Sequence, residues 1–168
     1  MSTSPEERID VRDDLSELCE ELSELALEHS IAVATVESLT AGNLAAMLGK
    51  APSSGDWFRG GIVAYDADVK HSLLRVPEGP VVSEVSAATM ARSACELLGA
   101  DMAIAVTGEA GPETQENEPP GTVWVGMCDR GVVTTERKQF DGEPEEILAQ
   151  TLSLSIESLV GHARRRSA

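Results

Sequence analysis

The chain has 168 residues, 42% of them hydrophobic, which is enough to bury the core of one domain, so we expect a single domain over residues 1–168. Its 29 acidic and 13 basic residues give a formal net charge of −16, which repels nucleic-acid phosphates and excludes general nucleic-acid binding. No apolar run approaches the ~20 residues of a membrane span, and the acidic start lacks the apolar segment of a secretory signal. We therefore expect a cytoplasmic protein without a membrane partner.

Two compositional features concern the cysteines and the basic residues. Cys19, Cys95 and Cys128 are far apart and lie in apolar stretches, the pattern of buried free thiols rather than of metal ligands. Only three of the 13 basic residues are lysine, and 3% of all residues are aromatic. Many acids with few lysines and aromatics are typical of high-salt proteins, which is our hypothesis for the source of this chain. The basic end 164–166 is interpreted as a solvated helix end.

The first half of the chain alternates between helical and strand patterns. Apolar residues recur at steps of three and four from Leu15 to Ala26, which predicts an amphipathic helix. A polar stretch at 37–42 then separates a short apolar run from an Ala- and Leu-rich helix that ends near Lys50. We expect strands at 31–36 and 61–65, a loop at 52–56, and a further helix from 66 or 67 to 75.

The second half begins with a long helix whose N-cap is Ser83. The residues expected on its buried side are Val85, Ala88, Ala91, Ala94, Cys95 and Leu98. Strands are expected at 102–106, 122–127 and 132–140, with a long loop at 108–121, a hairpin turn at 129–131 and a final helix from Pro144. This order predicts an α/β fold, a three-layer α/β/α sandwich whose sheet is mixed because of the late hairpin.

The first candidate site is the polar stretch between the first strand and the next helix. A hydroxyl of Ser38 or Thr40 would project from the end of the sheet, beside helix N–H groups that have no partner within the helix. Such a place suits a nucleophile with its oxyanion donors, or a bound phosphate. The alternative is that the two residues only cap the helix.

The second candidate site joins Tyr65, the only tyrosine, to Lys70 about one turn into the following helix. A partly desolvated lysine loses proton affinity and can act as a base toward a serine. The alternative is a surface lysine that pairs with Asp66 or Asp68.

The third candidate site is the stretch 106–112 with the segment 119–123 that closes its loop. Glycines after a strand let the backbone approach a ligand and direct N–H groups toward an anion. The stretch is neither a Walker A loop nor a dinucleotide fingerprint, and a plain long loop is the alternative. His29, His71 and His162 show no metal-ligand spacing, so we expect no metal.

Five motifs follow one another at family-like spacing. They are Glu37-Ser38-x-Thr40-x-Gly42; Trp57-Phe58 with Gly61-Ile62-Val63-Ala64-Tyr65 and Lys70; Val82-Ser83-Glu84; Thr107-Gly108-x-Ala110-Gly111-Pro112; and Pro119-Pro120-Gly121-Thr122-Val123-Trp124. In this order they resemble the CinA C-terminal domain family, whose stand-alone members are the PncC-type nicotinamide-nucleotide amidases. The resemblance covers nearly the whole chain. We expect no counterpart of the N-terminal molybdopterin-binding-like domain that bifunctional relatives carry.

The resemblance implies hydrolysis of nicotinamide mononucleotide to nicotinate mononucleotide and ammonia, without a metal or cofactor. Ser38 would be the nucleophile and Lys70 its base, with Tyr65 holding or shuttling the proton. The residues that would bind the substrate are Thr40, Ala41, Gly42, Thr107, Gly108, Gly111 and Arg137. Relatives tend to self-associate, so the resemblance also implies a homo-oligomer.

The chain departs from the family pattern at several polar positions. The family usually has Ser-Cys-Thr-Gly-Gly at residues 38–42 and Tyr-Ser-Asn at 65–67. Acids also stand where the family has other residues, at Glu109, Glu118 and Glu143. Fewer bases and more acids weaken attraction for a substrate phosphate. Either backbone N–H groups with Arg137 or Lys138 supply that attraction, or the substrate differs, or the protein is a catalytically silent nucleotide-binding or regulatory member. A direct DNA-uptake role fits a charge of −16 poorly.

Overall fold

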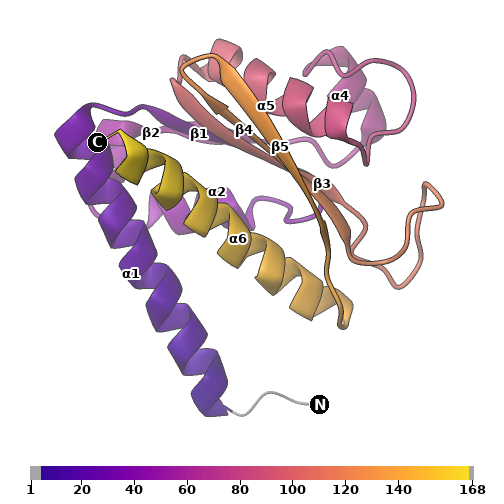
Figure 1. Ribbon diagram of the computed structural model, residues 1–168, viewed down its shortest axis with the longest axis horizontal. Helices are drawn as coiled ribbons and strands as arrows, with labels where there is room; N and C mark the ends of the chain where they lie inside the picture. Colours follow the sequence, from indigo (N-terminus) through magenta and orange to yellow (C-terminus); the bar gives the residue numbers. More distant parts are fainter. Residues whose placement is uncertain (1–4, 167–168) are drawn as a thin grey trace.

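The computed structural model describes residues 5–166, which form one five-stranded sheet between two layers of helices (Figure 1). The helices are α1 Pro5–His29, α2 Asn43–Gly49, α3 Ser54–Trp57, α4 Ala67–Ser72, α5 Glu84–Leu98 and α6 Pro144–Arg165. The strands are β1 Val33–Glu37, β2 Phe58–Val63, β3 Met102–Gly108, β4 Thr122–Asp129 and β5 Val132–Gln139. Their order in the sheet is β2-β1-β3-β4-β5.

The sheet is mixed, as predicted. Strand β1 is parallel to both of its neighbours, β2 and β3, whereas β4 is antiparallel to β3 and to β5. The central strand β1 is buried along its whole length, as expected of a parallel strand covered on both faces. The predicted three-layer sandwich is therefore confirmed.

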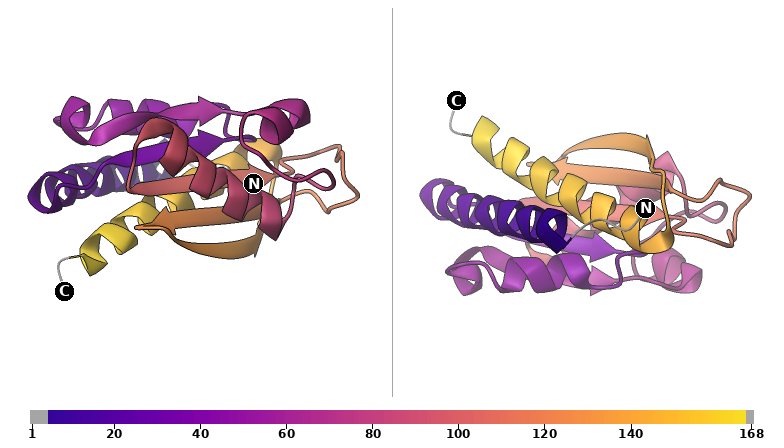
Figure 2. Two further views of the ribbon diagram at one scale, coloured as in Figure 1. Left: turned by 90° about the horizontal axis from the view of Figure 1, so that it is seen from above. Right: turned by 90° about the horizontal axis from the view of Figure 1, so that it is seen from below.

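The two faces of the sheet carry separate hydrophobic cores. One core joins the sheet to α1, α2 and α6, and the other joins it mainly to α5. Figure 2 shows α1 and α6 side by side on the first face and α5 across the second. The candidate residues follow the carboxyl ends of β1, β2 and β3.

Local sequence signals correctly predicted the start of one helix and the turn of one hairpin. The Ser83 hydroxyl oxygen accepts a hydrogen bond from the Ser86 N–H at 3.1 Å and caps α5 as predicted. The hairpin between β4 and β5 turns through Arg130 and Gly131, both with positive φ (51° and 79°). Positive φ at both central residues is the geometry of a type I′ turn, which matches the twist of the two strands.

The predicted buried side of α5 is wrong at its first turn. Val85 is 58% exposed, whereas Ser86 and Ala87 are buried. A side chain at Gly126 of β4 would collide with the Ala87 carbonyl oxygen, so the helix backbone lies directly against the strand there. Such close contact selects small residues for this face of the helix and turns Val85 outward.

Three further boundaries differ from the predictions. The expected loop at 52–56 contains the start of the short helix α3, because Ser54–Trp57 forms a single turn. Strand β2 begins at Phe58 rather than 61, and α4 ends at Ser72 rather than 75. None of the helices in the described part of the chain is long and apolar enough to span a bilayer.

The end of α6 is fixed to the sheet rather than solvated. The Arg166 guanidinium is buried and donates to the carboxylate of Asp101 at 2.9 Å and also to that of Asp129. The second Asp129 oxygen lies 3.3 Å from Nδ1 of His162. The interpretation of 164–166 as a solvated end is therefore wrong for Arg166, because the two acids that bind it are distant in sequence.

Candidate active site

Ser38 follows the carboxyl end of β1, between the segments that follow β2 and β3. The Ala64 N–H donates to the Glu37 carbonyl at 2.8 Å, and the Ser38 N–H donates to the Val106 carbonyl at 3.2 Å. The Ser38 side chain is almost enclosed, with 6% of the residue exposed. Backbone hydrogen bonds on both sides therefore fix the residue at the point where three parallel strands end.

The carboxylate of Glu37 caps α2 from the preceding strand. One oxygen accepts from the Leu44 N–H at 2.8 Å and from the Thr40 hydroxyl at 2.7 Å, and the other accepts from the Ala45 N–H at 3.0 Å. The carboxylate is fully buried. These N–H groups of the first helical turn are thus occupied by the protein itself, and Thr40 uses its hydroxyl to orient Glu37. Sequence reasoning did not assign Glu37 a role, although an acid at the end of an apolar strand was a visible signal.

The turn between Ser38 and α2 presents other N–H groups. The Ala41 N–H donates to the Ser38 carbonyl at 3.0 Å, which closes the turn. Among the residues whose side chains the structure describes, 14–166, the N–H groups of Leu39, Thr40 and Gly42 have no protein acceptor. Ala41 and Gly42 both have positive φ, 50° and 97°. The turn that follows Ser38 therefore offers N–H groups that are free to donate hydrogen bonds. It also holds Ala41 in a backbone conformation that is unusual for alanine.

Lys70 is buried, with 3% of the residue exposed. Its ammonium donates to the Tyr65 carbonyl oxygen at 3.4 Å. Burial lowers the pKa of Lys70, and the negative charges of Glu116, Asp66 and Glu109 oppose that effect. The alternative of a surface lysine is therefore wrong, and Asp66 instead caps α4 by accepting from the Asp68 N–H at 2.8 Å.

The position of the Lys70 ammonium follows from its neighbours. It contacts the carbonyl of Tyr65, two residues beyond β2, and the charge of Glu109, directly after β3, acts on its pKa. Strand β1 lies between β2 and β3, and Ser38 directly follows it.

The long loop after β3 closes against the segment that precedes α5. The Glu116 carboxylate accepts from the N–H groups of Val81 and Val82, at 2.7 Å each. The Thr107 hydroxyl donates to the Val81 carbonyl at 2.8 Å. Glu109 is buried, and its carboxylate accepts from the Gln115 N–H at 3.1 Å. Glu109, one of the acids at which the chain departs from the family pattern, is thus buried within the candidate site and does not lie on the surface.

Two glycines of this loop are required by protein contacts. A Cβ at Gly108 would lie 2.6 Å from the Thr122 carbonyl oxygen, so a side chain would push β3 and β4 apart. Gly111 has a φ of 78°, and its Cβ would lie 2.9 Å from a side-chain carbon of Pro120. The predicted reason for these glycines was approach to a ligand. The structure gives a second reason, which is close packing within the chain.

Two predicted residues are exposed, unlike the buried Ser38 and Lys70. The Tyr65 residue is 70% exposed, although its carbonyl accepts from Lys70. Arg137 lies on the edge strand β5, where its guanidinium is 3.7 Å from the Glu118 carboxylate. Glu118 therefore offsets the charge that was expected to attract a phosphate.

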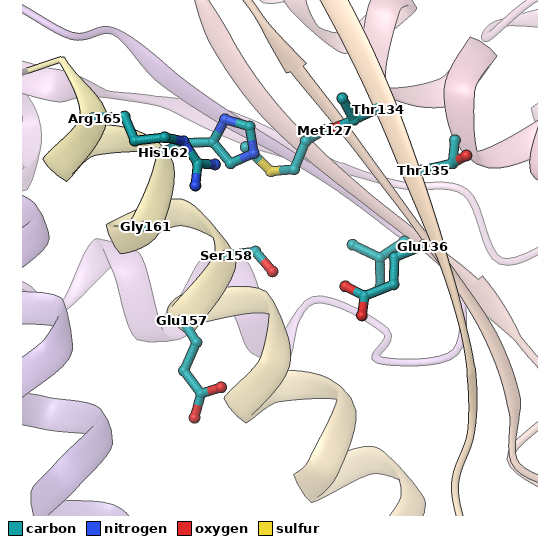
Figure 3. A pocket seen from close by; sticks show the side chains of 10 residues that line it. Met127, Thr134, Thr135, Glu136, Glu157, Ser158, Gly161, His162 and Arg165 are labelled. Atoms are coloured by element: carbon teal, nitrogen blue, oxygen red, sulfur yellow. The ribbon is translucent and has the colours of Figure 1, made fainter.

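The structure has two hollows that lie away from the predicted site residues. One, of about 460 Å³, lies between the β4–β5 hairpin and α6 (Figure 3). There His162, Arg165 and Met127 lie at one end and Glu136 at the other, with Ser158 between them. The second, of about 400 Å³, lies beside the turn at 130–131. Neither is lined by a predicted site residue. Among residues 14–166, whose side chains the structure describes, no three His, Cys, Asp or Glu side chains gather as ligands for a metal.

Comparison with known proteins decides the family. The family model for the CinA C-terminal domain matches residues 15–162. The chain belongs to the CinA C-terminal domain family. This match confirms the resemblance predicted from the five motifs.

The similar proteins within the family differ in length. "Nicotinamide-nucleotide amidohydrolase PncC" of Pseudomonas putida is 37% identical over 155 residues, which are 88% of this chain and 96% of that protein. A "CinA-like protein" of Frankia casuarinae is 38% identical over 128 residues, which are 73% of this chain but 30% of that protein. A crystal structure of a CinA superfamily protein from Klebsiella pneumoniae is 31% identical, with a TM-score of 0.85 over 90% of this chain and 98% of that one. The family fold is thus shared over nearly the whole chain.

Proposed function

We propose that this protein is an amidohydrolase that converts nicotinamide mononucleotide and water to nicotinate mononucleotide and ammonia. The likeness to the Pseudomonas putida amidohydrolase over 96% of its length supports the reaction class and substrate. The observation that carries the proposal is the burial of both Ser38 and Lys70, on segments that follow the neighbouring strands β1 and β2. A buried amine of lowered pKa within reach of a serine can activate its hydroxyl as a nucleophile.

In the proposed first step, the Ser38 hydroxyl attacks the carboxamide carbon while its proton passes to the neutral amine of Lys70. The oxygen of the carboxamide then gains negative charge. The free N–H groups of Leu39, Thr40 and Gly42 are the donors available to stabilise that charge. Because the turn at Ala41 is closed by a hydrogen bond to the Ser38 carbonyl, these donors need little rearrangement.

In the second step, the Lys70 ammonium returns a proton to the leaving nitrogen, the C–N bond breaks, and ammonia departs, which leaves the acyl group as an ester of Ser38. Water then hydrolyses the ester with Lys70 as the base, which gives the carboxylic acid and restores the serine. Tyr65 is the third member of the proposed set. Its phenol assists proton transfer, and its carbonyl oxygen orients Lys70 at 3.4 Å.

The assay that tests the proposal measures ammonia release from a panel of pyridine nucleotides at low and high salt. We expect release from nicotinamide mononucleotide and its loss in Ser38→Ala. An intact, folded protein that ignores this substrate at both salt concentrations would rule out the proposed activity.

A second candidate function is nucleotide binding without catalysis. The Glu118 carboxylate beside Arg137, together with the acids whose charges act on Lys70, favours it because these charges oppose an anionic substrate and work against the lowering of the Lys70 pKa by burial. In this case calorimetry would detect binding of a pyridine nucleotide to both the parent protein and Ser38→Ala. Neither protein would release ammonia.

We further propose that the protein works in the cytoplasm, at high salt, as a homo-oligomer and without nucleic acid. The charge of −16 and the free cysteines support the cytoplasmic location, the high salt and the absence of nucleic acid. The exposed Val63, at the end of the edge strand β2, and the exposed Tyr65, two residues beyond it, support self-association. Light scattering at high and low salt tests the oligomeric state.

A further inference from the structure

Two of the three cysteines form a close pair. Cys95 lies on α5 and Cys128 on the adjacent strand β4. The Cys95 thiol donates a long hydrogen bond to the Cys128 carbonyl, with Sγ and O 3.9 Å apart, and it also contacts the Cys128 thiol. Cys19, in contrast, is buried in the core on the opposite face of the sheet. The fold thus brings together two thiols that are 33 residues apart and leaves the third alone.

Small reagents can reach this pair. Both cysteines line the hollow of about 400 Å³ beside the turn at 130–131, together with charged side chains such as Arg92 and Arg130. Cys95 is partly exposed, whereas Cys128 is buried. The pair is remote from the candidate active site, because Cys128 is in register with Ala103, near the start of β3, and Ser38 lies near its end.

The surroundings decide which thiol reacts first. Burial raises the pKa of Cys95 to about 12, and the negative charges of Cys128, Asp101 and Asp129 add to the effect. Because the thiolate is the nucleophile in thiol oxidation, the raised pKa makes Cys95 a poor attacking group, and the first attack is assigned to its partner Cys128.

We propose that Cys95 and Cys128 are an oxidation site at which a small peroxide forms an intramolecular disulfide between α5 and β4. In the first step, the Cys128 thiolate attacks one oxygen of hydrogen peroxide, the O–O bond breaks, and the departing hydroxide takes up a proton to become water. In the second step, the Cys95 sulfur attacks the sulfenic acid on Cys128 and displaces its hydroxyl group. That group leaves as water with the Cys95 proton. Two thiols and one peroxide thus give one disulfide and two molecules of water.

The test counts free thiols in the full chain. The reduced, folded protein is treated with hydrogen peroxide, unfolded, and labelled with N-ethylmaleimide, and the labels are counted by mass. We expect the count to fall from three to one, a peptide map to show Cys95 joined to Cys128, and a dithiol reductant to restore all three labels.

Single substitutions identify the thiols that react. Cys19→Ser is the matched control, and its count should fall from two to zero with the same cross-linked peptide. Cys95→Ser and Cys128→Ser should each form no intramolecular disulfide. The proposal is overturned if three labels remain after treatment, if the cross-link includes Cys19, or if the cysteines gain oxygen without becoming joined.

Discussion

The Glu37 carboxylate accepts a hydrogen bond from the Thr40 hydroxyl at 2.7 Å and binds the N–H groups at the start of α2. This contact joins the strand before Ser38 to the helix after it. The carboxylate is fully buried, and its described contacts are neutral donors rather than basic side chains. The turn that carries the proposed nucleophile is therefore built on a buried acid.

Replacement of Glu37 should destabilise the fold. In Glu37→Gln, a side-chain amide brings N–H donors to a place where three donors already converge, so at least one N–H group loses its acceptor. We expect a loss of about 2–3 kcal/mol in the free energy of unfolding, measured by urea denaturation. Thr40→Val should cost about 1 kcal/mol by the same measurement, since it removes one donor. Thr40→Ser keeps the hydroxyl and is the control, and an equal loss in Thr40→Ser would contradict the assigned contact.

Ala41→Gly should stabilise the protein. Ala41 has a φ of 50°, in the left-handed region, where a Cβ is strained and glycine is not. Relief of this strain exceeds the entropy that glycine gains in the unfolded chain, and the expected net gain is about 0.5–1 kcal/mol in urea denaturation. Ala46→Gly is the matched control, because Ala46 is an exposed residue inside α2, where glycine should cost about 1 kcal/mol. Equal losses in both variants would show that the turn is not strained.

Loss of either proposed catalytic side chain should remove ammonia release while the fold is kept. We expect Ser38→Ala to lower kcat by a factor of about 10⁴ or more. Lys70→Met, which keeps the apolar stem, should lower kcat about 10²–10⁴-fold. Ser72→Ala and Lys50→Met are matched controls at exposed positions and should retain the parent rate. A Ser38→Ala protein of near-parent activity would contradict the role of the serine.

The pH dependence of activity should report on Lys70. The neutral amine is the active base, so the rate should rise with pH as Lys70 loses its proton. The Glu109 carboxylate raises the pKa of Lys70, against the larger lowering by burial. In Glu109→Gln the pKa of Lys70 therefore falls further, and the rising limb of kcat against pH should move to lower pH.

The control for this shift is Glu113→Gln, an exposed acid of the same loop. It should leave the profile in place. A Glu109→Gln protein that is less active at every pH, with an unmoved profile, would show that Glu109 only supports the loop through Gln115.

Arg166→Ala should loosen α6 from the sheet. The Arg166 guanidinium is buried between the carboxylates of Asp101 and Asp129, which lose their partner in the variant. Because Asp101 is partly exposed, we expect a loss of about 1–3 kcal/mol, less than for a fully buried pair. Thermal unfolding at low and high salt measures it. Arg165→Ala, one residue earlier and exposed, should leave the unfolding temperature nearly unchanged.

The sequence by itself determined the features that depend on neighbouring residues. The alternation of apolar periods predicted the strands and, except for the short α3, the helices in their observed order. The cap at Ser83 and the hairpin turn at 129–131 were predicted because a cap needs one hydroxyl and a tight turn needs positive φ. The order of five motifs gave the family.

Only the tertiary structure decided which distant groups meet. A lysine with acids nearby in sequence resembles a surface ion pair, and only the folded chain shows that Lys70 is buried. The same holds for the Cys95–Cys128 pair and for the acids around Arg166. Burial and charge pairing depend on residues tens of positions apart along the chain. The periodicity of apolar residues carries no information on contacts between such distant residues, so only the folded structure shows which of them meet.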